Sequence, residues 1–403
     1  MTSSERLTIW RYYLYRISLN NGFFIPVGIL YMQHRGLGLD VIGFTQGAFL
    51  FAVVAAEIPT GYLGDRIGRR QSLILGNSLV ALVMGIYPFA DSFPGFVVLY
   101  VVWAFGTSFK SGTSEAWLYE MLERRLDESQ FARINGRGRS FTLGTSALAA
   151  ASAGALFAIN PVIPFFANAA LSALGIPVLL SLPKVKVEDE DEDPFGLQDA
   201  VAALHVQVSE PKIRWFVLYV SLFFAVLEIA RSYEQPAAVE VGMPVTLIGI
   251  MYGVFKLLSA GAASLAGTVE ERLGIRTAFV LLVPLVVVAY ATVYFLPQMI
   301  IVVFFMLRGS RSITGPLRNQ YLNDRLESTG RATALSGISM TMSLAGGTAQ
   351  FLAGEIVTHT GVIDMLMVSG VGIMALAALL WLSTSPIRTP NQSATETEAA
   401  MTD

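Results

Sequence analysis

Residues Gly61–Arg70 read Gly-Tyr-Leu-Gly-Asp-Arg-Ile-Gly-Arg-Arg and form a short charged connection between two long apolar segments. A weaker copy recurs 206 positions later, at Gly267–Arg276. The same offset, without any gap, pairs identical residues around both copies: Ile42 with Ile248, Gly43 with Gly249, Gly47 with Gly253, Phe49 with Phe255, Gly61 with Gly267, Arg66 with Arg272 and Gly68 with Gly274. A repeat of half the chain length, with glycines in register, predicts two homologous helical bundles.

The composition places these bundles in a membrane. Hydrophobic residues make up 54% of the chain and charged residues 14%, and the mean hydropathy is +0.58. A spanning helix needs about 20 largely apolar residues. We predict twelve such segments, six in each half: 8–33, 41–62, 71–91, 95–121, 134–158, 161–182, 213–236, 244–266, 277–296, 298–322, 332–357 and 361–383. Their length, and runs of small residues such as Ala147–Gly154, favour helices over a β-barrel.

The chain between and after the two bundles is polar. An acidic run occupies residues 188–193, and apolar residues then recur every three or four positions from Leu197 to Val208, which is typical of a short amphipathic helix. We therefore predict four regions: an N-terminal six-helix bundle (1–183), a cytoplasmic acidic linker with an amphipathic helix (184–211), a C-terminal six-helix bundle (212–385) and a disordered tail (386–403).

Basic residues predict the orientation. They gather in the connections on one side of the membrane, whereas the opposite connections hold essentially Arg35 alone: Arg66, Arg69, Arg70, Arg124, Arg125, Arg133, Arg137, Arg139, Lys184, Lys186, Arg272, Arg276, Arg325, Arg331 and Arg388. We expect the chain in a plasma or inner membrane. Because cytoplasmic loops carry the excess of Lys and Arg, we expect both termini to lie in the cytoplasm. The first helix lacks a cleavage site after a short apolar region, so we expect it to stay as an anchor.

The segment Gly61–Arg70 resembles the signature loop between the second and third helices of the major facilitator superfamily, and the resemblance covers essentially the whole chain. It implies twelve transmembrane helices in two pseudo-symmetric six-helix bundles, and secondary active transport of a small solute by alternating access. Residues Glu57–Gly61 and Ser111–Glu120 resemble a prokaryotic branch described as multidrug efflux. That similarity implies a proton-coupled antiporter that exports drugs or organic anions. A solute uptake transporter and a non-transporting receptor with the same fold remain alternatives.

The resemblance also implies a gating motif: Gly61, Gly64, Asp65, Arg66, Gly68, Arg69 and Arg70. Asp65 lies at a helix end, where its charge can meet a helix terminus or an arginine and hold the cytoplasmic side closed. The alternative is that the three arginines only fix the topology at the lipid surface, and both roles can coexist.

Ionisable residues inside apolar segments mark the expected transport path, because a charge facing lipid is costly. We expect seven of them to bind substrate or to couple transport: Lys110, Glu115, Glu228, Arg231, Lys256, Arg308 and Arg311. Glu115 and Glu228 are the titratable candidates, and the surplus of bases favours an anionic solute. Alternatively, Glu228, Arg231 and Glu234, spaced by three, pair among themselves, and Lys110 pairs with Glu115. Arg16, Glu57, Glu115 and Glu355 lie near segment ends, where side chains reach the interface.

Enzymatic and metal chemistry find no support in the sequence. The chain has no cysteine, and its three histidines, His34, His205 and His359, map to connections or to the amphipathic helix. There is no Gly-Lys-Ser/Thr nucleotide loop. We therefore predict no enzyme activity, no cofactor, no metal and no nucleic-acid partner. The expected partners of the monomer are a small solute, protons and the lipid bilayer.

Overall fold

The computed structural model describes residues 3–125, 127–183, 213–326, 331–384 and 386–387, and the regular elements in these ranges are all helices. The helices run as follows: α1 (Ser3–Ser18), α2 (Gly28–His34), α3 (Leu39–Ile67), α4 (Arg69–Ile86), α5 (Phe93–Ser108), α6 (Thr113–Arg125), α7 (Phe131–Ile159), α8 (Ile163–Ser181), α10 (Arg214–Glu240), α11 (Val245–Ser264), α12 (Ala266–Val280), α13 (Leu282–Phe295), α14 (Ile300–Asn323), α15 (Arg331–Thr360) and α16 (Val362–Thr384). The predicted amphipathic helix at 197–208 and the tail after residue 387 lie outside the described residues.

The described part of the chain contains nine helical spans that are long and apolar enough to cross a membrane. A tenth is the pair α12 and α13, which are bent by 64° at their junction. Each of the twelve predicted segments coincides with a helix or with two consecutive helices. The prediction of an all-helical membrane protein is therefore confirmed.

Two predicted segments are interrupted. The sequence predicted one helix over 8–33, but α1 ends at Ser18 and α2 begins only at Gly28. Asn20 lies in this break, and its Oδ1 accepts a hydrogen bond from the backbone nitrogen of Gly22. A second break separates α5 from α6, where Gly112 has a φ of +71°. At these two points the helix is interrupted by a side-chain hydrogen bond to the backbone and by a glycine with positive φ. Neither changes the hydropathy of the segment, so the sequence prediction did not show the breaks.

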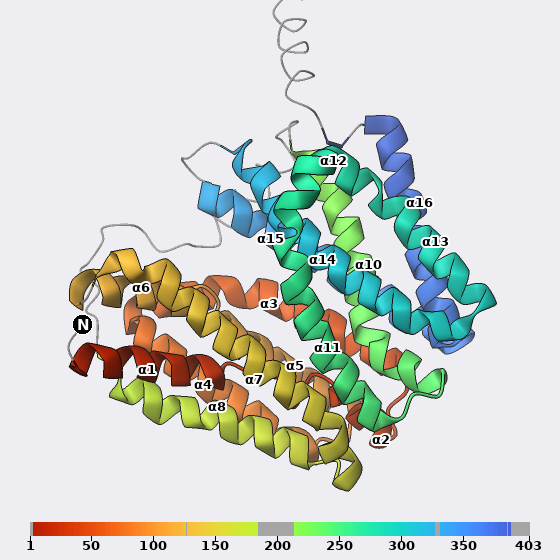
Figure 1. The fold of residues 1–403 in the computed structure, drawn as a ribbon. Helices are drawn as coiled ribbons and strands as arrows, with labels where there is room; N and C mark the ends of the chain where they lie inside the picture. The colour runs from red at the N-terminus through yellow and green to blue at the C-terminus, as the bar shows by residue number, and fades with distance from the viewer. Residues whose placement is uncertain (1–2, 126, 184–212, 327–330, 385, 388–403) are drawn as a thin grey trace, which may run out of the picture. The chain divides into compact units, whose positions relative to one another are not determined.

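The chain divides into two compact units. The first unit comprises the described residues up to 183 together with Ala238–Leu257, and the second comprises residues 213–237 together with the described residues from Leu258 onward. In the first unit α4 packs against α5 and α8, and α1 lies beside α8 (Figure 1). In the second unit α13 packs against α16, and α12 against α14.

The half-chain repeat is visible in the backbone. Gly68 and Gly274, 206 positions apart, have nearly the same conformation, with φ/ψ of 86°/153° and 73°/156°. Gly36 and Gly242, separated by the same offset, have φ values of 82° and 86°. Residues with a side chain rarely adopt positive φ, so these turns require glycine in both halves. The backbone therefore confirms the repeat register and extends it to Gly36.

Within the first unit, α7 and the N-terminal part of α11 approach at backbone distance. A Cβ atom on Gly249 would lie 2.7 Å from the nitrogen of Gly154 and 2.8 Å from the carbonyl oxygen of Ala150. A Cβ on Gly154 would in turn overlap the carbonyl oxygen of Val245. Small residues therefore permit this contact, as they do between membrane helices in general.

Candidate functional site

Helices α10 and α14 of the second unit are joined by a bidentate ion pair. Arg308 on α14 donates through Nε to Glu234 Oε1 (3.0 Å) and through NH2 to Glu234 Oε2 (2.6 Å). The carboxylate belongs to α10, and its residue is only 2% exposed. The planar guanidinium matches both carboxylate oxygens, which makes this the stronger kind of salt bridge. The sequence did not predict this partner for Glu234.

One α10 carboxylate is shared by two arginines. Arg311 on α14 donates through NH1 to Glu228 Oε1 at 2.7 Å. Arg231, one turn further along α10, places its NH2 2.6 Å from Glu228 Oε2. The predicted pairing of Arg231 with Glu228 is thus present, but Arg311 competes for the same carboxylate. Arg311 also lies over the ring of Phe224, with its guanidinium carbon 5.4 Å from the ring centre.

Burial makes these ion pairs interdependent. Glu228 is 1% exposed, whereas the side chains of Arg231 and Arg311 keep 34% and 41% of their surface accessible. A buried carboxylate needs its counter-charges, and removing one member of such a pair costs about 3–5 kcal/mol. Arg311 therefore reaches a polar space with part of its side chain while it neutralises the buried Glu228 carboxylate.

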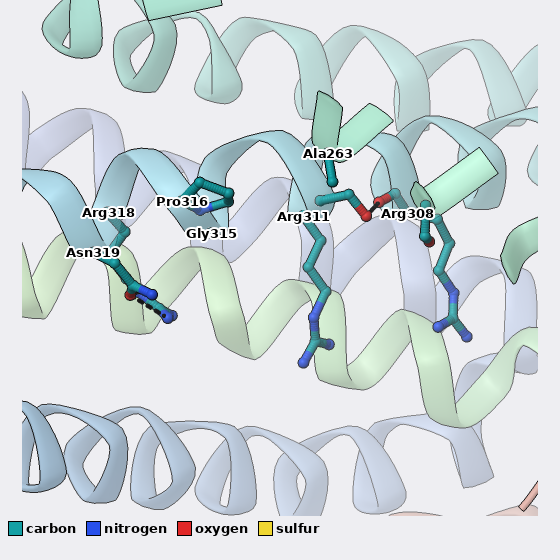
Figure 2. A pocket seen from close by; sticks show the side chains of 9 residues that line it. Ala263, Arg308, Arg311, Gly315, Pro316, Arg318 and Asn319 are labelled. Carbon is teal, nitrogen blue, oxygen red and sulfur yellow. Dashed lines mark hydrogen bonds between the residues drawn. The ribbon is translucent and has the colours of Figure 1, made fainter. Parts of the chain in front are cut away.

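That space is a pocket of about 600 Å³ along α14. Its lining includes Arg308, Arg311, Gly315 and Arg318, which recur at intervals of three or four along one face of the helix, together with Ser259 of α11. Figure 2 shows Arg308 and Arg311 extending from the same side of α14. A pocket of this size suits a small organic molecule.

Arg318 is a pocket residue that the sequence analysis missed. Its Nε and NH2 donate to Asn319 Oδ1 at 3.2 and 2.9 Å (Figure 2), and its NH1 lies 3.4 Å from Met342 Sδ on α15. It forms no ion pair with any carboxylate in the described part of the chain. Its spacing of seven from Arg311, two helical turns on one face, was the available signal.

The other predicted path residues belong to the first unit. Lys110 lies in the break between α5 and α6, with its side-chain stem packed against Gly76 of α4. Glu115 pairs with Arg139 of α7 at 2.6 Å, so the predicted alternative of a Lys110–Glu115 pair is wrong for this conformation. Lys256 is partly buried on α11. None of these three lines the α14 pocket.

The gating motif is mostly helical and not a loop. Helix α3 continues to Ile67 and α4 begins at Arg69, so Gly68 alone forms the turn. Gly61 and Gly64 therefore lie inside α3. The side chain of Asp65 lies outside the described side chains. Its role as a latch stays a prediction.

Two arginines of the motif, Arg69 and Arg70, connect helices within the first unit. Arg69 forms an ion pair with Glu120 of α6. Arg70 donates to the carbonyl oxygens of Leu179 (2.8 Å) and Leu180 (2.5 Å), which closes the C-terminal end of α8. Arg66 stacks on the ring of Tyr62 at 4.3 Å. These contacts give the arginines a structural role in addition to any effect on topology.

Arg16 is buried inside the first unit, and its predicted depth near the membrane interface stays a prediction. Only 8% of its surface is exposed, and its NH1 lies 3.5 Å from Ser114 Oγ.

The sequence profile described as Major Facilitator Superfamily matches residues 17–343 and 238–400, which together cover most of the chain. The chain belongs to the Major Facilitator Superfamily. Members of this superfamily are multi-pass membrane transporters. The superfamily suggested by Gly61–Arg70 is thereby confirmed, whereas the similarity to drug exporters remains a prediction.

Curated relatives of this superfamily are distant. The MFS-type transporter YxaM of Bacillus subtilis (strain 168) is 21% identical over 238 residues, which cover 58% of this chain and 59% of YxaM. Monocarboxylate transporter 13 of Bos taurus is 30% identical over 102 residues, 24% of this chain and 23% of that protein. In both cases the matched region spans less than two thirds of the relative.

Solved structures of the superfamily share the fold over nearly the whole chain. The nucleoside transporter NupG superposes with a TM-score of 0.75 at 13% identity, covering 95% of this chain and 98% of NupG. A D-xylose-proton symporter superposes with a TM-score of 0.66 at 13% identity, covering 93% of both chains. At this identity the likeness establishes the fold and leaves the solute open.

Proposed function

We propose that this chain is a secondary active transporter that exchanges or cotransports protons with a small solute, and that Glu228 is its coupling residue. The observation that carries the proposal is the sharing of one buried carboxylate between Arg231 and Arg311. A carboxylate that alternates between cavity water and a closed, low-dielectric state can bind and release a proton as its cationic partners change. Among the structural neighbours, the xylose transporter is named as a proton symporter.

In this proposal the six-helix bundles at 1–183 and 212–385 alternate in access around the solute, and the chain works as a monomer in a plasma or inner membrane with cytoplasmic termini. The glycine contact between α7 and α11 is suited to a gate, because two backbones that meet without side chains between them can seal a path.

Gating by Asp65 belongs to the same proposal. Asp65→Asn should slow turnover and leave insertion and abundance near normal, whereas loss of insertion would indicate a topological role.

Proton coupling is testable before the solute is known. The purified chain is reconstituted into liposomes loaded with a pH-sensitive dye, and a panel of nucleosides, sugars, drugs and organic acids is added. We expect at least one solute to drive proton movement that an ionophore dissipates. Proton movement in the direction of the solute indicates uptake by symport, and opposite movement indicates export by antiport. Solute exchange without proton movement contradicts the coupling, and no flux of any kind favours the receptor alternative.

A further inference from the structure

The charges around the α14 pocket do not balance. Arg231, Arg308, Arg311 and Arg318 carry four positive charges, whereas the carboxylates that pair with them are Glu228 and Glu234. Within the described residues, the cluster therefore has two positive charges in excess. An unbalanced charge of this kind inside a membrane segment is costly, and a bound counter-charge would lower that cost.

The excess is concentrated at Arg311 and Arg318. Arg308 is held by both oxygens of Glu234, so its charge is neutralised locally. Arg311 has only one oxygen of a carboxylate that Arg231 also uses. Arg318 has amide and thioether partners but no described carboxylate. The two arginines line the same pocket, two turns apart on α14.

We propose that this pocket binds the carboxylate group of a small organic anion between Arg311 and Arg318, and that the anion displaces Glu228 from Arg311. The proposal rests on the proposed transport function and specifies its solute class. A guanidinium offers parallel N–H donors that fit a carboxylate. The remaining wall, formed in part by Ala263, Gly315 and Pro316, offers apolar surface for an organic body.

Displacement of Glu228 would link solute to coupling. When the solute carboxylate binds the Arg311 guanidinium, Glu228 keeps Arg231 as its one described ion-pair partner. The buried Glu228 carboxylate then has fewer counter-charges, which favours binding of a proton. Solute binding would thereby change the protonation of Glu228, as coupled transport requires. A cationic solute would instead meet like charge at both arginines, which disfavours it.

A structural alternative assigns Arg318 to the lipid surface. It lies five positions before the end of α14 at Asn323, and long basic side chains near helix ends commonly extend to the headgroups. In that case its replacement would not alter the selection of ligands. Arg325 provides the matched control, because its guanidinium stacks on Tyr321 at 3.6 Å and it does not line the pocket.

The test compares binding of matched ligands to the purified full chain. The probes are the straight-chain carboxylates from propionate to octanoate and benzoate, each with its primary amide, and the readout is the ligand-dependent rise in melting temperature. We expect carboxylates to stabilise the protein and the amides to have little effect. Arg318→Gln breaks no described ion pair and should weaken carboxylate binding at least tenfold, whereas Arg325→Gln should not. Arg311→Gln is a second variant, interpreted only if it remains folded.

Three results overturn the proposal: equal stabilisation by carboxylates and amides, carboxylate binding unchanged in Arg318→Gln, or no response to any carboxylate of the panel. Failure of the transport function is distinguishable. Carboxylate binding without solute-driven proton movement would retain this site and reject coupling. Proton movement driven only by neutral solutes would retain coupling and reject the anion site.

Discussion

Gln350 of α15 donates a hydrogen bond to the main-chain oxygen of Glu228 at 2.7 Å, and a second to Ser232 Oγ at 2.6 Å. Both acceptors belong to α10, and Gln350 has no exposed surface. Glu228 therefore pairs with two arginines through its side chain and is fixed to α15 through its backbone oxygen. Gln350 is therefore a positioning residue for Glu228.

We predict that Gln350→Met lowers the free energy of unfolding by about 1–3 kcal/mol, because methionine keeps the volume and removes both donors from buried acceptors. Thermal melting of the purified protein measures this effect. Gln320→Met is the control, since Gln320 is exposed where it donates to Glu270 and its loss should cost about 0.5 kcal/mol or less. Equal melting of the two variants would contradict the positioning role.

Glu228→Gln should abolish accumulation of solute against its gradient and spare exchange at equal concentrations on both sides. The reason is that an amide cannot carry the coupled proton, while the two arginines and the pocket remain. Accumulation and exchange are measured in the same proteoliposomes, after the abundance of the variant has been checked. Glu115→Gln is the comparison, because Glu115 pairs with Arg139 at a partly exposed position. Retained accumulation in both variants would exclude both residues as the coupling site.

The glycines of the gating motif should differ sharply in their tolerance to alanine. Gly68→Ala should cost about 1–3 kcal/mol, since φ of 86° with ψ of 153° is a conformation essentially restricted to glycine. Gly61→Ala should be neutral or slightly stabilising, because its Cβ would meet nothing within 4 Å and alanine favours the helix. The melting temperatures of both variants test this difference. A similar loss of stability at Gly61 and at Gly68 would show that the space around Gly61 is also restricted.

Gly249→Ala should loosen the contact between α7 and α11, because the new methyl group would overlap backbone atoms of Gly154 and Ala150. Overpacking of this kind typically costs about 1–3 kcal/mol. Gly261→Ala in the same helix is the control, since a Cβ there meets nothing within 4 Å. Melting and proteolysis of the two variants test the prediction. An unchanged Gly249→Ala protein would mean that the two backbones separate easily.

Hydropathy and the repeat sufficed to predict the helices, because a membrane span has a length and composition that the sequence shows directly. They did not predict the breaks after Ser18 and Ser108, which depend on local bonds at Asn20 and on the backbone of Gly112. The dipeptide Asn21-Gly22 is a turn signal that was available and unused.

The site was harder to predict than the fold. Spacing along α10 sufficed for the Glu228–Arg231 pair, because both residues share one helix. The partners of Glu234 and Arg311 lie 74 and 83 positions away, and spacing within one helix carries no information on which helices meet. The same holds for Glu115. Its partner is Arg139 on the next helix, and not Lys110, which is nearer in the sequence.

The glycine turns shared by the two halves also bear on how this chain arose and how it can be altered. If one ancestral half was duplicated, Gly36 with Gly242 and Gly68 with Gly274 are what each copy had to retain, because any side chain there strains the turn. The charged residues follow the repeat only in part: Arg66 of the first copy matches Arg272 of the second, whereas Arg69 corresponds to Ile275. The offset of 206 therefore serves as a map for backbone engineering: a turn replacement tolerated in one half is a rational first choice for the other, whereas charge changes must be designed separately for each.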